Sequence, residues 1–148
     1  MRNQQTIKDV QSLLDSGGIV TINLTGVSFD NRQDKIKKMI NRHEKEIWLI
    51  PEPDNEWDEF AIIVASDGKP IGFIPKSKGF SITLPKRKRP ISFGKDIIDA
   101  DGKMLQTNEV FCKTICNMNC RGMVSEFLNY GDDDNIPIGV KIQFWGVN

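Results

Sequence analysis

A polar loop with one large aromatic residue is the part of this chain best suited to chemistry. Residues 52–58 read Glu-Pro-Asp-Asn-Glu-Trp-Asp and lie between two apolar runs. Loop propensity does not explain a tryptophan at position 57, among acids and an asparagine. Two interpretations are open: the Trp57 indole packs into the core beneath the loop, or its face stacks on an unpaired base. Base stacking of this kind is worth about 1–3 kcal/mol per base.

The carboxylates of the same region allow other chemistry to be considered. Asp54, Glu56, Asp58 and Glu59 could form a catalytic carboxylate pair or a cation site. A calcium loop of the EF-hand type needs a regular ladder of ligands around a central glycine, which this loop lacks. The sequence also lacks the P-loop, Rossmann, HExxH and G-x-S-x-G patterns. We therefore expect no enzyme activity and no cofactor, and a hydrolase that uses the acidic loop has the least support.

Three cysteines stand at C-x3-C-x3-C spacing, which places Cys112, Cys116 and Cys120 near one face of a helix. A structural zinc needs four ligands in closed tetrahedral geometry. No fourth ligand lies nearby, and the only histidine, His43, is far away in sequence. We expect the cysteines to act as small hydrophobic side chains against the core, with no metal bound. An odd, clustered set is also a poor disulfide framework and fits a reducing cytoplasm.

Alternating and β-branched apolar residues predict an antiparallel meander on either side of the loop. Strands are expected at residues 19–27, 47–50, 61–65, 70–74, 123–128 and 138–146. Asp67-Gly68 is a strong signal for a two-residue hairpin turn. The side chains expected in the core of this meander are Trp48, Leu49, Ile62, Val64, Ile71, Ile74 and Phe144.

Helical periodicity predicts three further elements. A helix over residues 6–15 should end at Ser16-Gly17-Gly18. A second should follow Asp30 and Gln33, which stand at capping-box spacing, and His43 should lie on the surface at its exit. A third is expected over residues 108–119 with Thr107 as N-cap. The apolar faces expected to be buried are Ile7, Val10, Leu13 and Leu14; Ile36, Met39 and Ile40; and Val110, Phe111, Ile115 and Met118.

Charge is separated along the chain although the formal net charge is zero. Residues 76–89 carry only basic charges, and residues 44–59 are mostly acidic. Residues 85–90 form a basic turn between two expected short strands, so the side chains of Lys86, Arg87, Lys88 and Arg89 should be exposed. Such blocks can form a dipolar surface with one basic face, or they can be two solvated loops.

The composition bounds the class of protein. The chain has 148 residues, of which 39% are hydrophobic and 27% charged, so we expect one globular domain over residues 1–148. No apolar run approaches the ~20 residues of a membrane span. The polar start of the chain shows no signal peptide. We therefore expect a cytoplasmic protein with no membrane partner.

In order and spacing, three motifs resemble the HIRAN domain, a small β-barrel module found alone or fused to DNA translocases and helicases. They are residues 26–29 (Gly-Val-Ser-Phe), residues 52–58, and residues 71–76 (Ile-Gly-Phe-Ile-Pro-Lys), with a weaker echo at residues 142–146. The resemblance implies an all-β fold with added helices: a small OB/SH3-like antiparallel barrel of about six strands. Residues 1–18 would be an N-terminal helical extension and residues 77–107 an insertion.

The resemblance also implies site residues. HIRAN domains bind single-stranded DNA, and the best-studied type holds a free 3′-hydroxyl end. By the resemblance, Phe29 stacks on a base, while Asn55, Trp57 and Asp58 form the end pocket, with Asp58 accepting a hydrogen bond from the terminal hydroxyl.

Two positions depart from that type. Ser28 replaces an arginine and Phe73 replaces a histidine, which removes a phosphate contact and a polar pocket wall. Arg32, Lys76 or the basic insertion could compensate. We therefore expect a single-stranded DNA-binding module that recognises 3′ ends in DNA repair, with a helicase or translocase as a candidate partner. The alternative is a protein-interaction module that keeps the barrel and has lost DNA binding.

Overall fold

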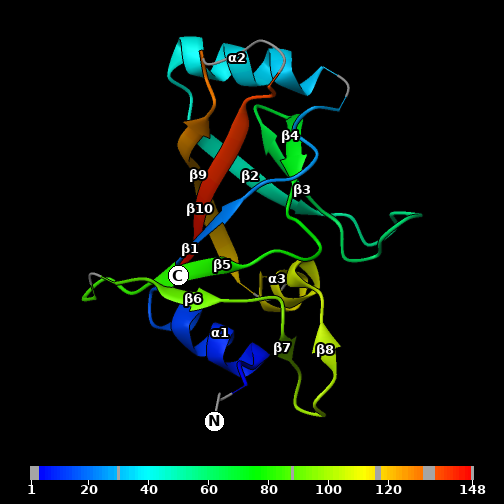
Figure 1. The fold of residues 1–148 in the computed structure, drawn as a ribbon, viewed down its shortest axis with the longest axis vertical. Helices are drawn as coiled ribbons and strands as arrows, with labels where there is room; N and C mark the ends of the chain where they lie inside the picture. The colour runs from blue at the N-terminus through cyan, green and yellow to red at the C-terminus, as the bar shows by residue number, and fades with distance from the viewer. Residues whose placement is uncertain (1–3, 30, 88, 116–117, 132–135, 148) are drawn as a thin grey trace.

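The computed structural model describes residues 4–29, 31–87, 89–115, 118–131 and 136–147. Within these residues the chain is mostly β-strand with three α-helices (Figure 1), which confirms the expected β-rich class. The helices are α1 (Ile7–Asp15), α2 (Arg32–Arg42) and α3 (Thr107–Ile115). The strands are β1 (Ile19–Asn23), β2 (Glu46–Pro51), β3 (Ile62–Ser66), β4 (Lys69–Phe73), β5 (Phe80–Thr83), β6 (Ile91–Phe93), β7 (Ile97–Ile98), β8 (Met104–Leu105), β9 (Asn119–Leu128) and β10 (Gly139–Val147).

The described strands form one large antiparallel sheet and a small hairpin. The large sheet has eight strands in the order β4-β3-β2-β9-β10-β1-β5-β6, and β7 pairs with β8. About six strands were expected. The difference arises because β5 and β6, from residues 77–107, extend the sheet beyond β1. The strand order is that of an open sheet, with β4 and β6 at its edges.

A short contact ties the edge strand β4 to the chain that follows β1. The Thr25 N–H donates to the Phe73 carbonyl at 3.0 Å, and the Phe73 N–H donates to the Thr25 carbonyl at 2.8 Å. Gly72 lies at this contact, and a Cβ atom there would stand 2.9 Å from the Thr25 oxygen. The turn after β1 therefore lies directly beside β4, which brings residues far apart in sequence to one place.

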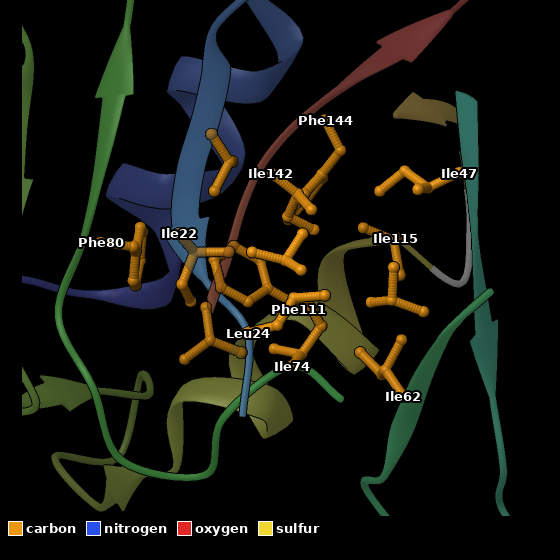
Figure 2. Packing of buried hydrophobic residues seen from close by; sticks show 14 of the residues in the cluster. Ile22, Leu24, Ile47, Ile62, Ile74, Phe80, Phe111, Ile115, Ile142 and Phe144 are labelled. Carbon is orange, nitrogen blue, oxygen red and sulfur yellow. The ribbon is translucent and has the colours of Figure 1, made fainter. Parts of the chain in front are cut away.

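The core is centred on the aromatic ring of Phe111, which α3 inserts among the strands (Figure 2). Phe111 meets the rings of Phe80 and Phe144 edge-on, with centroid distances of 4.7 and 5.1 Å. The predicted core residues Ile62, Val64, Ile71, Ile74 and Phe144 are buried, and Leu49 is half-buried against them.

Trp48 was expected in the core, and this prediction is wrong. Its side chain is 53% exposed, and Ile50 on the same strand is also exposed. Ile47 is buried and Leu49 packs against the core. Successive side chains of a strand point to opposite faces of the sheet. Trp48 and Leu49 are neighbours on β2, so they cannot both point into the core.

Helices α1 and α2 begin and end close to the expected positions. A capping box joins Thr6 and Asp9 at the start of α1. Helix α2 ends at His43, which is exposed and adopts left-handed backbone torsions. Of the side chains expected to be buried, Val10, Leu14, Ile36 and Met39 are buried, and Ile7, Leu13 and Ile40 are half-buried. Asp30, half of the expected capping box of α2, lies outside the described residues.

Thr107 was expected to cap α3, but it is the first residue of the helix. Its hydroxyl donates to the Lys78 carbonyl at 2.9 Å and accepts from the Lys78 N–H at 3.2 Å. The Glu109 carboxylate instead accepts from the Gln106 N–H at 3.3 Å. Thr107 therefore joins α3 to the chain after β4. Val110, Phe111 and Ile115 are buried on α3 as expected. The helix ends at Ile115 and not at residue 119, so the half-buried Met118 lies beyond it, just before β9.

The expected basic turn lies between β5 and β6, and these are the two short strands that were predicted on either side of it. Lys86, Arg87 and Arg89 are exposed as expected, and Lys88 lies outside the described residues. The two-residue strands β7 and β8 were not predicted, since segments of that length carry no readable alternation. Within the described ranges, no helix combines the length and apolar character that crossing a membrane requires.

Candidate nucleic-acid interface

A cavity of about 490 Å³ opens between the loop that joins β2 to β3, the turn after β1, the end of β4 and the start of α3. We call it the aromatic pocket. It is lined by Thr25, Gly26, Phe29, Asn55, Trp57, Asp58, Ala61, Phe73, Ile74, Pro75, Lys76, Ser77, Lys78 and Asn108. Most of the candidate residues therefore lie around one cavity, namely Phe29, Asn55, Trp57, Asp58, Phe73 and Lys76.

Two aromatic side chains of the aromatic pocket stand in solvent. Trp57 is 88% exposed and Phe29 is 64% exposed. The interpretation that Trp57 packs into the core is therefore wrong. Large aromatic side chains are mostly buried in folded proteins. Exposed aromatic side chains that gather around a cavity are typical of binding sites, whereas single exposed ones scattered over a surface are not.

Asn55 builds the turn that presents Trp57. Its Oδ1 accepts from the backbone N–H groups of Trp57 and Asp58, both at 2.9 Å. Its Nδ2 donates to the Glu52 carboxylate at 3.1 Å. Asparagine side chains that bond the backbone ahead of them form such turns. Asn55 lines the aromatic pocket, but its amide groups are engaged within the loop, so it positions its neighbours.

Asp58 provides a carboxylate in the aromatic pocket, and its partners come from three segments. Oδ1 accepts from the Phe60 N–H at 2.9 Å. Oδ2 accepts from Asn108 Nδ2 at 2.7 Å and lies 4.0 Å from the Lys76 ammonium nitrogen. A carboxylate offers about four lone-pair sites. Oδ2 can therefore accept a further hydrogen bond from a ligand donor.

Asn108 is the functional candidate that sequence reasoning missed. It is 1% exposed, and its Oδ1 has no hydrogen-bond partner within the part of the chain that the structure describes. Fifty positions separate it from Asp58, and no local pattern connects the two. The one available signal was a polar residue at the start of an apolar helix, which is also typical of ordinary helix ends.

Arg32 packs against the rings of Phe73 and Phe29 but does not line the aromatic pocket. Its Nη1 donates to the Gly26 carbonyl at 2.7 Å. Its Cζ lies 4.9 Å from the centroid of the Phe73 ring and 6.0 Å from that of Phe29. Guanidinium groups over aromatic faces are attracted at these distances. Ser28, the remaining candidate, is exposed and does not line the aromatic pocket.

The cysteines contribute no site among the described residues. Cys112 lies on α3 but Cys120 lies on β9, so the expectation that Cys120 shares a helix face with the others is wrong. Cys112 and Cys120 are half-buried and pack against the core, as expected, and Cys116 lies outside the described residues. Burial raises the pKa of the Cys120 thiol, which keeps it protonated. In the described ranges, no group of three or more His, Cys, Asp or Glu side chains could hold a metal ion. The absence of a bound metal stays a prediction.

The chain matches no protein-family model, no curated protein and no solved structure. The aromatic pocket combines two exposed aromatic faces with the carboxylate of Asp58 and the ammonium groups of Lys76 and Lys78.

Proposed function

We propose that this protein is a single-stranded DNA-binding module that holds a free 3′-hydroxyl end and has no catalytic activity of its own. The observation that carries the proposal is the exposure of Trp57 and Phe29 around a cavity that also contains Asp58. Unpaired bases offer flat apolar faces that stack on such side chains, which lets one site accept different sequences.

Each group of the aromatic pocket has a role in this proposal. Trp57 and Phe29 stack on the terminal bases. The ammonium groups of Lys76 and Lys78, both exposed, attract the phosphates. Asp58 Oδ2 accepts a hydrogen bond from the terminal hydroxyl and repels a phosphate at the same position.

The proposal includes a fold relationship. We infer that the large sheet is a variant of the OB/SH3-like barrel of HIRAN domains, with β5 and β6 as additions. The hydrogen bonds between Thr25 and Phe73 support this, because they connect the edge strand β4 back to the chain after β1. The series β4-β3-β2-β9-β10-β1 would then return on itself, and OB-type barrels carry nucleic-acid sites on one face and its loops.

The setting follows from the proposed ligand. A module that holds DNA ends without catalysis needs an enzyme to act on them, so the proposed partner is a helicase or translocase. The proposed location is the cytoplasm, and the proposed process is DNA repair.

The test compares two exposed tryptophans. Trp57→Ala should weaken binding of a single-stranded oligonucleotide by about 1–3 kcal/mol, measured by fluorescence anisotropy at low salt. Trp48→Ala is the control, because Trp48 is also exposed but lies on β2 outside the aromatic pocket. It should leave the affinity unchanged. Equal losses for the two variants, or no binding by the wild type, would overturn the proposal.

One observation favours a second function, that of a protein-interaction module. Trp48 and Trp145 line a second cavity, on the outer face of β2 and β10, together with Met123. Trp48 is exposed, Trp145 and Met123 are half-buried, and Lys45, Glu46 and Arg121 also line the cavity. Apolar side chains rimmed by charged ones are typical of interaction surfaces. The partner would be a protein with a complementary apolar surface. This function replaces the first if no oligonucleotide binds at low salt, if the wild-type chain captures a partner protein, and if the Trp48→Ala variant does not capture it.

A further inference from the structure

A polar cavity of about 490 Å³ adjoins the aromatic pocket across β1, β5, β6 and β10. We call it the polar groove. It is lined by Thr21, Ile22, Asn23, Lys78, Gly79, Phe80, Ser81, Ser92, Phe93 and Lys141. Lys78 lines both cavities, so the polar groove begins where the aromatic pocket ends.

The floor of the polar groove includes a row of small hydroxyl side chains. Thr21 stands opposite Ser81, and Ser81 opposite Ser92, in the strand register. Gln143, opposite Thr21 on β10, donates to the Thr21 hydroxyl at 3.3 Å from just outside the lining. Their neighbours along the strands, such as Val20 and Ile82, are buried. Because side chains alternate between the faces of a strand, the row lies on the face opposite the core.

The charge of the polar groove is positive. Lys78 and Lys141 supply ammonium groups, and none of the lining residues in the described part of the chain carries a carboxylate. Lys141 lies opposite Asn23 and pairs with Glu126, at 3.5 Å between Nζ and Oε2. Both side chains of this pair are substantially exposed, and surface pairs of this kind are weak. The Lys141 ammonium can therefore turn to an anion in the groove.

We infer that the polar groove binds the sugar–phosphate backbone of the same single strand whose 3′ end occupies the aromatic pocket. Hydroxyl, amide and ammonium donors are the groups that contact phosphate oxygens without reading sequence. Lys78 lines both cavities, which gives the path of the DNA. The DNA strand leaves the aromatic pocket past Lys78 and crosses β5 and β1 towards Lys141. This inference rests on the proposed function and adds the path of the strand and the minimum length of the ligand.

The test measures the affinity of oligonucleotides of two lengths, about 4 and about 12 nucleotides, which lie within the range of site sizes known for single OB folds. Both carry a 3′-hydroxyl end. The longer one should bind the wild-type chain more tightly and with a steeper salt dependence. Lys141→Gln should lower the log–log salt slope for the longer ligand by about 0.7, as expected for one neutralised phosphate. The same variant should leave the affinity for the shorter ligand unchanged.

Glu126→Gln is the matched control, because it breaks the same ion pair and leaves the Lys141 ammonium in place. Its affinity for the longer ligand should equal or exceed that of the wild type. The inference is overturned if length adds nothing, if Lys141→Gln leaves the slope unchanged, or if Glu126→Gln causes the same loss. In each of these cases the shorter ligand still binds and the proposed function stands. If neither ligand binds, both proposals fall.

Discussion

Trp57 and Asp58 are neighbours in the chain, yet their side chains are held in different ways. The indole of Trp57 extends into solvent from a turn that Asn55 organises. The carboxylate of Asp58 is held by Phe60 and Asn108 and approached by Lys76. At the scale of single residues, the loop therefore presents two kinds of group. The Trp57 indole is an exposed surface for stacking, and the Asp58 carboxylate is a charged group that hydrogen bonds hold in place.

Gly26 lies beside Arg32 and Phe73, the side chains that hold Phe29 in place, so a substitution there tests these contacts. Its φ is +69°, and an added Cβ would stand 3.1 Å from Arg32 Nη1 and 3.3 Å from the Phe73 ring. Gly26→Ala should cost about 1–2 kcal/mol for the left-handed backbone, plus the displacement of these neighbours. The free energy of unfolding in urea and the oligonucleotide affinity should both fall.

Gly102→Ala is the matched control for Gly26→Ala. Gly102 has a φ of +81° but nothing within 4 Å of the added Cβ, so it carries only the backbone cost. Its oligonucleotide affinity should equal that of the wild type. If the two variants lose the same stability and Gly26→Ala keeps full affinity, the contacts around Gly26 do not support the site.

Most of the candidate residues could be named from the sequence, because they lie on the three short motifs that carry the resemblance. Whether Trp57 is exposed could not be predicted, since an aromatic residue in a loop packs either way. Asn108 was missed for a different reason. Its contact with Asp58 depends on how α3 docks against the β2–β3 loop, and local pattern carries no information about such docking.

At the scale of elements, the alternation of strands decides which apolar residues form the core. On β2, Ile47 is buried while Trp48 and Ile50 are exposed. Strands β1 to β4 could be predicted because their residues are β-branched and a clear Asp67-Gly68 turn joins two of them. The prediction failed at Trp48 because hydrophobicity was given more weight than the period of the strand.

Ile62→Ala tests the core that β3 provides. Ile62 is fully buried, so the cavity left by the truncation should cost about 2–5 kcal/mol in the free energy of unfolding. Ile50→Ala is the control, since it removes the same atoms from the exposed face of the neighbouring strand. It should cost well under half of that. Comparable losses in urea denaturation would show that β3 does not face the core as described.

At the scale of the whole molecule, segments distant in sequence build the site. The aromatic pocket takes residues from the turn after β1, the β2–β3 loop, the end of β4 and α3. Residues 77–107 add β5 and β6, and with them two strands of the polar groove. The sequence predicted these strands, but the pairing of β5 with β1 requires long-range contacts that the alternation of side chains does not specify.

The basic turn between β5 and β6 should add sequence-independent attraction for DNA, although the formal net charge of the chain is zero. Replacing Lys86, Arg87, Lys88 and Arg89 with Gln should flatten the log–log salt slope of binding, by about 0.7 for each phosphate that the turn no longer neutralises. Lys37→Gln with Lys38→Gln is the control, because these side chains are exposed on α2 and line none of the described cavities. An unchanged slope in the first variant, or an equal decrease in the control, would place the path of the DNA elsewhere.

The most direct test of the central claim compares one oligonucleotide with a 3′-hydroxyl and with a 3′-phosphate, on the wild type and on Asp58→Asn. The variant keeps the shape of the side chain, and the Asn108 amide can rotate so that its Oδ1 accepts from the new Nδ2. Lys76 offsets part of the repulsion, so the wild type should prefer the hydroxyl by about tenfold, or 1.4 kcal/mol. In Asp58→Asn the ratio of the two affinities should approach one. Equal affinities in the wild type, or a ratio that Asp58→Asn leaves unchanged, would contradict recognition of the end by Asp58.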